Sequence, residues 1–295
     1  MRREQIDAAL AAQLVAEQFP QWDELPVVPV EFSGWDNRTF RLGDTMTVRL
    51  PSGEAYASSV EKELVWLPRL ASALPCPIPV PVAAGAPSAR FPWPWSIRRW
   101  IDGRSAATAP VADPVAFAGQ LADFLRALQQ VDPADGPPTG EENFYRGGDL
   151  AVYDDETRRA TALFATVIDP DAVIEMWEGA LAARWDGPPV WFHGDFAPGN
   201  LLLDESGCLA AVIDFGQCGV GDPACDLVIA WTLLRGRARD TFRAAMAVDD
   251  AMWMRGCGWA LWKALSTVMA GDAGSYFIEQ AHDVLRELLA TNDPR

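Results

Sequence analysis

The segment 191–231 constrains this chain more than any other part of it. It reads WFHGDFAPGNLLLDESGCLAAVIDFGQCGVGDPACDLVIAW and sets two carboxylates and an amide at fixed spacing. Asp195 closes a His-Gly-Asp triplet, Asn200 lies five residues later, and Asp214 follows an apolar run. The stretch 201–213 predicts two short strands joined by a turn, so one loop and one strand end deliver all three polar side chains.

This combination of side chains suits phosphoryl transfer. In such reactions one Asp lies at the acceptor hydroxyl, while an Asn and a second Asp hold Mg²⁺ on the nucleotide phosphates. The plain alternative is that Asp195 caps a turn, Asn200 is a loop residue and Asp214 ends a strand. Chance is a poor explanation for the occurrence of Asp195, Asn200 and Asp214 in this order and at this spacing. No G-x-x-x-x-G-K-[ST] motif occurs in the chain, which excludes the phosphate loop of P-loop NTPases.

These motifs resemble those of the aminoglycoside phosphotransferase family, antibiotic-type small-molecule kinases with a protein-kinase-like fold. The family pattern is a His-Gly-Asp loop with a later Asn, an Asp that opens the metal loop, and Gly-Asp-Pro-x-x-Asp, found here at 221–226. The resemblance is densest over 191–231 but spans most of the chain, touching residues 35–51, 60–75, 92–103 and 255–261. It implies an α+β, bilobal fold with a β-rich N-lobe and a mainly helical C-lobe.

The chain changes character near residue 103, in agreement with two lobes. Short β-like runs precede this point (27–32, 38–42, 46–50 and 95–101), and mostly helical patterns follow it (113–128, 155–168, 171–185 and 223–290). We therefore expect an N-terminal nucleotide-binding lobe over 1–101, with a hinge near 98–103. The C-terminal lobe, 102–295, would carry the catalytic loop, the metal loop and the acceptor pocket.

Local signals refine the elements of the front part. Apolar spacing predicts a helix over 4–18 and another over 59–74 that is interrupted at Pro68. Gly43-Asp44 predicts the turn of a hairpin. The tract PCPIPVP, 75–81, is expected to be extended, because each proline removes a donor and restricts its predecessor.

The resemblance assigns a role to each motif residue of the C-lobe. Asp195 would orient the acceptor hydroxyl or take its proton, while Asn200 and Asp214 would ligate Mg²⁺. Asp226 would brace the catalytic loop from the next helix. Two neighbours have structural explanations: Asp222 precedes a proline and is typical of an N-cap, and His193 is a scaffold residue because Asp195 fills the role of base.

In the N-lobe, the resemblance points to residues that would contact the nucleotide. Ser33 and Gly34, between two predicted strands, would form the turn over the phosphates, although a full G-x-G-x-x-G is lacking. Kinase-like folds place a Lys on the third strand, paired to a helix Glu. The corresponding position here is Arg49, a guanidinium that can grip phosphate bidentately. Glu63 is its expected partner, with Glu61 second.

The hinge contributes backbone rather than side chains. Backbone groups of Arg99 and Ile101 should contact the purine, and the side chains there do not distinguish ATP from GTP. The co-substrate is therefore expected to be ATP or GTP, with Mg²⁺ as the metal ion.

Charge is distributed unevenly between the two halves. The chain has a formal net charge of −17. Residues 1–100 carry 10 basic and 11 acidic side chains, whereas residues 101–295 carry 14 and 30, a net of −16. A strongly acidic chain is a poor partner for nucleic acid. The acidic half favours either a solvated surface or a pocket for a cationic ligand.

Other composition facts predict a reduced, cytoplasmic protein. The five cysteines are scattered without a Cys-x-x-Cys, which argues against a disulfide framework or a zinc site. The start of the chain lacks a secretory apolar region, and no run of 18 apolar residues predicts a membrane span. The sequence does not predict an oligomeric state.

Candidates for the acceptor pocket are aromatic and acidic residues of the C-lobe. The tryptophans are more typical of core than of a ligand pocket. The acidic side chains could bind amines but could equally cap helices or face solvent. The candidates are Trp231, Trp253, Trp259 and Trp262, and the clusters Asp149/Asp154/Asp155/Glu156 and Asp249/Asp250/Asp272.

The sequence therefore predicts an ATP- or GTP- and Mg²⁺-dependent O-phosphotransferase. Its acceptor would be a hydroxyl on a small, cationic, aminoglycoside-like antibiotic or metabolite. Alternatives within the same chemistry are a macrolide, an amino alcohol or a sugar amine, because a fold does not fix a substrate. A catalytically silent nucleotide-binding scaffold is the alternative of another class, supported only by Arg49 in place of Lys.

Overall fold

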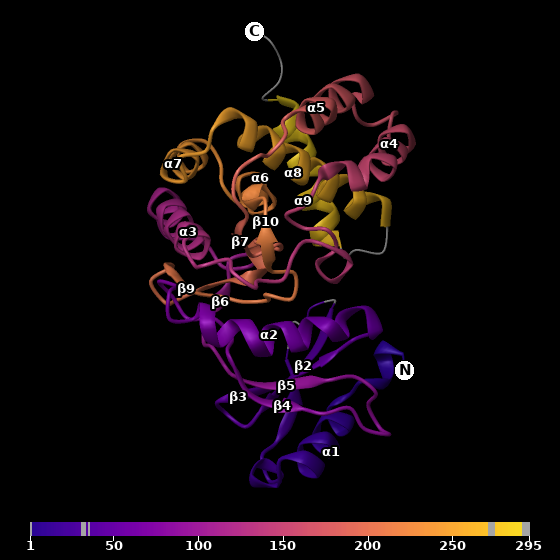
Figure 1. The fold of residues 1–295 in the computed structure, drawn as a ribbon, viewed down its shortest axis with the longest axis vertical. Coiled ribbons are helices and arrows are strands. Elements are labelled where there is room, and N and C mark those ends of the chain that lie inside the picture. The colour runs from indigo at the N-terminus through magenta and orange to yellow at the C-terminus, as the bar shows by residue number, and fades with distance from the viewer. Residues whose placement is uncertain (1, 31–33, 35, 271–274, 291–295) are drawn as a thin grey trace.

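A computed structural model describes residues 2–30, 34, 36–270 and 275–290, the last range without the side chains of its first two residues (Figure 1). Its N-terminal part is an antiparallel sheet of five strands in the order β1-β2-β3-β5-β4. The remainder is mainly helical. The predicted β-rich front and helical back are therefore confirmed. The strands of the sheet are β1 (Val27–Pro29), β2 (Asn37–Leu42), β3 (Met46–Pro51), β4 (Pro81–Gly85) and β5 (Trp95–Arg99).

A hairpin and two helices build this sheet layer. The turn between β2 and β3 places Gly43 at a φ of 58°, a conformation that glycine adopts without a steric cost. Helix α1 (Ala8–Gln18) begins after the cap Asp7, later than the predicted start at residue 4. It buries Leu14 against Phe40 and neighbouring strand residues on one face of the sheet. Helix α2 (Ala57–Leu70) lies on the other side, between the sheet and the C-terminal part (Figure 1).

The predicted interruption of α2 at Pro68 is wrong. The helix continues through Pro68 and ends two residues later, at Leu70. Proline removes a single intrahelical hydrogen bond, to the carbonyl of residue 64. Leu67 and Leu70 on either side of it are fully buried, and burial of two leucines stabilises this last turn.

Strand β4 was not predicted. It starts at Pro81, at the end of the tract expected to be extended, and continues to Gly85. Its sequence is a proline followed by mostly small residues, so it lacks the alternation of apolar side chains that predicts a strand. Proline is tolerated there because β4 is an edge strand of the sheet and Pro81 is its first residue.

The C-terminal part combines seven helices of the described residues with two small sheets. Helix α3 begins after Asp113, whose side chain accepts from two backbone N–H groups, as predicted. The sheets pair β7 (Val190–Phe192) with β10 (Gly219–Gly221), and β8 (Leu201–Leu203) with both β6 (Arg104–Ser105) and β9 (Leu209–Val212). The helices are α3 (Pro114–Gln129), α4 (Asp154–Leu163), α5 (Pro170–Ala182), α6 (Ile229–Thr232), α7 (Arg237–Ala245), α8 (Asp250–Ala270) and α9 (Ser275–Ala290).

The chain passes from the large sheet to the C-terminal part within a few residues. Strand β5 ends at Arg99, and β6 begins at Arg104 in a different sheet. Between them Gly103 has a φ of 157°, and a Cβ there would lie 2.8 Å from Cβ of Leu202. This close approach requires glycine. The predicted hinge near 98–103 covers this connection, and the bounds 1–101 and 102–295 with their assigned roles stay a prediction.

The buried apolar residues form two clusters rather than one. The smaller cluster joins α1 to the five-stranded sheet. The larger cluster fills the helical part and also includes Leu67, Leu70 and Ile78, which precede the connection. The last turn of α2 is therefore packed into the core of the C-terminal part.

Candidate active site

The loop between β7 and β8 is held by backbone contacts that require specific residues. Gly194 has a φ of 82°, and a Cβ there would lie 2.3 Å from the carbonyl oxygen of Gln217. The carboxylate of Asp226 accepts from the backbone N–H of His193 at 2.7 Å and of Gly194 at 2.8 Å. Asp226 therefore braces the loop, as expected. Burial raises the pKa of Asp226 to about 7, and the two N–H donors oppose that rise.

His193 has a scaffold position, in line with its predicted role. The backbone N–H of Asp195 donates to Nδ1 at 3.2 Å, which leaves Nε2 as the donor to the carbonyl of Ile213 at 3.1 Å. The ring is fully buried, and this burial lowers its pKa, so the neutral form is favoured. The imidazole thereby links the loop to the strand end before Asp214.

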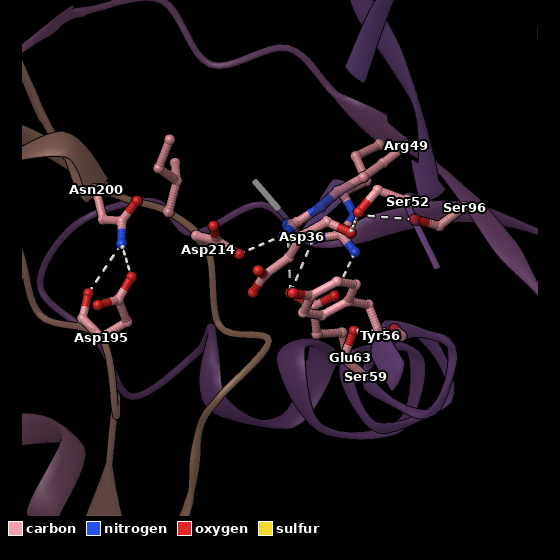
Figure 2. Close-up of polar contacts among 12 residues, drawn as sticks. Asp36, Arg49, Ser52, Tyr56, Ser59, Glu63, Ser96, Asp195, Asn200 and Asp214 are labelled. Carbon is pink, nitrogen blue, oxygen red and sulfur yellow. Dashed lines mark hydrogen bonds and ion pairs between the residues drawn. The ribbon is translucent and has the colours of Figure 1, made fainter. Parts of the chain in front are cut away.

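The carboxylate of Asp195 is held at both oxygens. The amide nitrogen of Asn200 donates to the backbone carbonyl and to Oδ2 of Asp195, both at 2.9 Å. Figure 2 shows these two contacts. Lys263 of α8 donates to the other carboxylate oxygen, Oδ1 of Asp195, at 2.5 Å. Burial by itself would raise the pKa of Asp195, but the charge and hydrogen bond of Lys263, with smaller contributions from Arg146 and His193, together lower the pKa to about 2. Asp195 is therefore ionised throughout the neutral range.

Asp214 lies between the catalytic loop and the large sheet. Its φ of 66° is unusual for a residue other than glycine and turns its side chain toward β3. Arg49 donates to Oδ1 of Asp214, and a Cβ on Gly34 would lie 3.9 Å from Oδ2. Asp36 lies beyond it (Figure 2), and burial with the charges of Asp214 and Asp195 raises the pKa of Asp36 to about 6.

Asn200 and Asp214 offer ligands that suit Mg²⁺. The amide nitrogen of Asn200 is used by Asp195, so its carbonyl oxygen faces away from that residue (Figure 2). An amide oxygen with a carboxylate is a donor set that Mg²⁺ accepts when nucleotide phosphates and water complete the octahedron. Within the described ranges no group of three His, Cys, Asp or Glu side chains could hold a metal ion by itself.

The strand arginine and the helix glutamate meet as predicted, with an addition. Arg49 Nη1 lies 3.5 Å from Oε1 of Glu63, whereas the side chain of Glu61 is exposed. Arg98 of β5 binds the same carboxylate more closely, at 3.2 and 2.6 Å. Burial would raise the pKa of Glu63, but Arg98 and then Arg49 hold it near 2.

Arg98 was missed, although strand alternation carries the signal. In β5, Trp95 and Ile97 face the apolar cluster below the sheet, so Ser96 and Arg98 face α2. Arg49 has the same orientation in β3. Two arginines on one face of adjacent strands need a buried acid, and Glu63 supplies it.

Four more residues were predicted to contact the nucleotide, and the structure describes three of them. Ser33 lies outside the described residues. Gly34 is next to Asp214, and its carbonyl accepts from Arg3 at 2.8 Å. Arg99 pairs with Met46 at the end of β5, and Ile101 follows in the connection to β6.

A pocket lies beside Asp195, on the side away from the sheet. It is lined by Arg146, Trp259, Trp262 and Lys263 together with the catalytic loop. Arg146 and Lys263 were missed, because they come from a loop and a late helix with no motif. The only available signal was that Lys263 is one of two lysines in the chain.

The tryptophan and acidic candidates divide between core and pocket. Trp231 and Trp253 pack against each other with tilted rings whose centres are 4.6 Å apart, whereas Trp259 and Trp262 line the pocket. Most acids have local partners. Asp149 and Asp249 cap backbone N–H groups. Three acids accept from side chains: Asp154 from Arg158 and Trp177, Glu156 from Trp262, and Asp250 from Arg243. Asp155 is exposed, and Asp272 lies outside the described residues.

None of the helices in the described part of the chain combines the length and hydropathy that a membrane crossing needs.

The likeness to solved structures extends over nearly the whole chain. The GDP and kanamycin complex of APH(2")-IIia superposes with a TM-score of 0.75 at 21% identity, over 95% of this chain and 98% of that one.

Two further solved structures show the same fold. The GDP complex of aminoglycoside 2'-phosphotransferase-IIIa gives a TM-score of 0.70 at 19% identity, over 97% of this chain and 99% of the other. Macrolide 2'-phosphotransferase MphH from Brachybacterium faecium gives 0.62 at 22% identity, over 97% and 99%. The predicted bilobal, protein-kinase-like fold is thereby confirmed.

Sequence comparisons agree with the fold. The uncharacterized protein YcbJ of Bacillus subtilis (strain 168) is 24% identical over 174 residues, which cover 56% of this chain and 51% of that protein. The match therefore spans about half the length of this relative. A sequence model of the phosphotransferase enzyme family matches residues 27–261. On this evidence, the chain belongs to the phosphotransferase enzyme family.

Proposed function

We propose that this protein transfers the terminal phosphoryl group of ATP or GTP, in a Mg²⁺-dependent reaction, to a hydroxyl of a small molecule. The observation that carries the proposal is the ordered set Asp195, Asn200 and Asp214, in which Asn200 contacts Asp195 and the carboxylate of Asp214 faces the sheet. Relatives of this fold that are complexes with GDP and with ATP support the nucleotide.

The acceptor hydroxyl would lie against Asp195. Because its carboxylate is fixed by Asn200 and Lys263, Asp195 can hold one hydroxyl orientation without a reorganisation cost. A carboxylate whose pKa lies near 2 is a weak base. In this site Asp195 therefore contributes mainly by orienting the hydroxyl, as a loose phosphoryl-transfer reaction requires.

The nucleotide phosphates would lie between Asp214 and β3. Arg49 is held there by Glu63 and Asp214, and its guanidinium can bind phosphate oxygens in a fork. Asn200 and Asp214 would hold Mg²⁺, which when bound neutralises charge on the phosphates. Gly34, above Asp214, leaves space for a close approach of the phosphates, because it has no side chain.

The acceptor class follows less directly from the site. The net charge of −16 over residues 101–295 favours an aminoglycoside-like cation as the first class to test. A macrolide is the second, supported by the likeness of the fold to a macrolide 2'-phosphotransferase. Amino alcohols, sugar amines and hydroxy acids complete the panel.

The test is nucleotide consumption over this acceptor panel with wild-type protein and Asp195→Asn. The substitution keeps the size of the side chain and removes its charge, so we expect kcat to fall at least about 100-fold while nucleotide affinity changes little. Asp240→Asn, an exposed site on α7, is the control for loss of one negative charge. Equal turnover by wild type and Asp195→Asn would overturn the proposal.

A further inference from the structure

The pocket beside Asp195 contains two positive side chains and one negative one. Arg146 and Lys263 approach from a loop and from α8, and Asp195 approaches from the catalytic loop. Trp259 and Trp262 supply aromatic walls. Two cations and one carboxylate therefore line the pocket, and Glu156 lies behind its wall, where it accepts from Nε1 of Trp262 at 3.3 Å.

Arg146 is buried with part of its hydrogen-bonding capacity unused. Its side chain donates through Nε to the carbonyl of Gly194 at 3.1 Å, and its guanidinium stacks on Trp262 at 4.4 Å from the ring centre. The residue is only 8% exposed, and Nη1 finds no hydrogen-bond partner among the described residues. A buried guanidinium with an unpaired donor is costly, so this site favours an acceptor group.

Lys263 supplies further donors in the same pocket. An ammonium has three N–H donors, and the structure assigns one acceptor, Oδ1 of Asp195 at 2.5 Å. The side chain is 32% exposed, so its other N–H groups can donate to a ligand while the contact with Asp195 is kept. An amine of a ligand placed here would meet Lys263 and Arg146 as like charges.

We propose that the acceptor carries an oxyanion, a carboxylate in a small hydroxylated acid, which binds to Arg146 and Lys263 while its hydroxyl lies at Asp195. The proposal rests on the proposed function for the reaction, and it names an anionic acceptor in place of the cationic class that the net charge alone favours. A carboxylate would accept a hydrogen bond from Nη1 of Arg146 and pair with the ammonium of Lys263. Both hydrogen bonds would be charge-assisted. The cavity volume is about 10 Å³, room for roughly one water molecule, so only the carboxylate end of the acid would enter it.

The acidic charge of the C-terminal half does not contradict this assignment. Charges at the surface act through solvent and are screened over about 8 Å at physiological ionic strength. Arg146 and Lys263 act by direct contact in a partly closed site, where interactions are stronger. Contacts in the pocket therefore decide which group is bound, and an acceptor amine would have to lie outside it.

Two matched sets of probes test the proposal by binding. Gluconate, sorbitol and glucamine share a six-carbon polyol chain that ends in a carboxylate, an alcohol or an amine. Glycerate, glycerol and 3-aminopropane-1,2-diol repeat the comparison with three carbons. Each is titrated to about 50 mM against the full chain with Mg²⁺ and ADP, and affinity is read from thermal stabilisation.

We expect a carboxylate to bind at least about tenfold more tightly than its alcohol and amine counterparts. Lys263→Met and Arg146→Gln should each remove most of this preference. Arg237→Gln, an exposed site on α7, removes the same charge and should leave the preference within about twofold. If Arg146→Gln does not fold, the partly exposed Lys263→Met still decides the result.

Failure of this proposal differs from failure of the proposed function. No stabilisation by either carboxylate, or an equal or larger effect of the amines, would overturn the oxyanion pocket. Carboxylate binding without phosphoryl transfer to any acceptor would overturn the proposed function and leave the pocket assignment standing.

Discussion

At the scale of single residues, the buried carboxylates of this protein are controlled by their cations. Glu63 has Arg98 and Arg49, and Asp195 has Lys263. In both sites burial favours the neutral acid, and the neighbouring cations together with their hydrogen bonds outweigh it. These carboxylates therefore stay charged at neutral pH, which fixes the hydrogen bonds of the arginine pair and of the catalytic loop.

Glu63→Gln should reduce stability strongly. It leaves Arg98 buried without a counter-charge and Arg49 with Asp214 alone, which costs about 3–5 kcal/mol at neutral pH. The pKa of Glu63 near 2 lies below the ordinary value of 4.5, so its ionisation stabilises the fold above pH 4.5 and this contribution is lost as pH falls toward 2. Urea unfolding of wild type and variant from pH 2.5 to 7 measures both effects.

Glu61→Gln is the matched control on the same helix, since the side chain of Glu61 is exposed. It should change the free energy of unfolding by less than about 0.5 kcal/mol. An equal loss in the two variants, or an unchanged pH dependence in Glu63→Gln, would contradict the assigned arginine pair.

Gly194→Ala should reduce catalysis more than nucleotide binding. The added Cβ would approach the carbonyl oxygen of Gln217 to 2.3 Å at a φ of 82°, so the loop must move and carry Asp195 with it. A displacement of about 1 Å can lower kcat about 100-fold. Gly199→Ala in the same loop meets nothing within 4 Å and is the control. Steady-state kinetics of both variants separates kcat from KM, and a similar kcat in the two would refute the argument.

Sequence reasoning found the polar residues that share one segment. Asp195, Asn200 and Asp214 are recognisable because a loop and a hairpin bring them together within twenty residues. Lys263 and Arg146 reach the site from distant segments, through a helix and a loop that only tertiary packing places there. Such residues carry no local pattern, which is why they were not predicted.

At the scale of elements, helices and hairpins with strong local signals were predicted well. The β2–β3 turn and the cap of α3 follow from a glycine in a turn and an Asp-Pro pair. Strands β4, β6 and β10 have five residues or fewer and lack alternation of apolar side chains. They form because partner strands offer hydrogen bonds, a long-range effect that local propensity does not contain.

The connection between β5 and β6 is an element whose geometry depends on one glycine. Gly103→Ala places Cβ 2.8 Å from Cβ of Leu202 at a φ of 157°. We expect a loss of about 1–3 kcal/mol, because strain and overlap occur together. Gly119→Ala within α3 meets nothing within 4 Å and should raise stability by up to about 1 kcal/mol. Chemical denaturation of the pair measures the difference, and stabilisation by both substitutions would contradict the close approach.

At the scale of the whole molecule, two apolar clusters share one helix. Helix α2 carries Glu63 toward the sheet arginines and buries Leu67 and Leu70 in the larger cluster. The ion pair of Arg49 with Asp214 adds a polar link between β3 and the segment that follows β9. We therefore expect folding of the sheet part to be coupled to folding of the helical part, although the sequence divides them near residue 101.

This coupling predicts a single thermal transition. Leu70→Ala in the larger cluster and Leu14→Ala in the smaller one each truncate a fully buried leucine, at a cost of about 2–5 kcal/mol. If the two clusters unfold together, both variants lower one common transition and keep it sharp. If they unfold independently, Leu14→Ala shifts only one of two transitions. Differential scanning calorimetry distinguishes the cases, and a second, unshifted peak in Leu14→Ala would show that the α2 contacts are too weak to couple the two clusters.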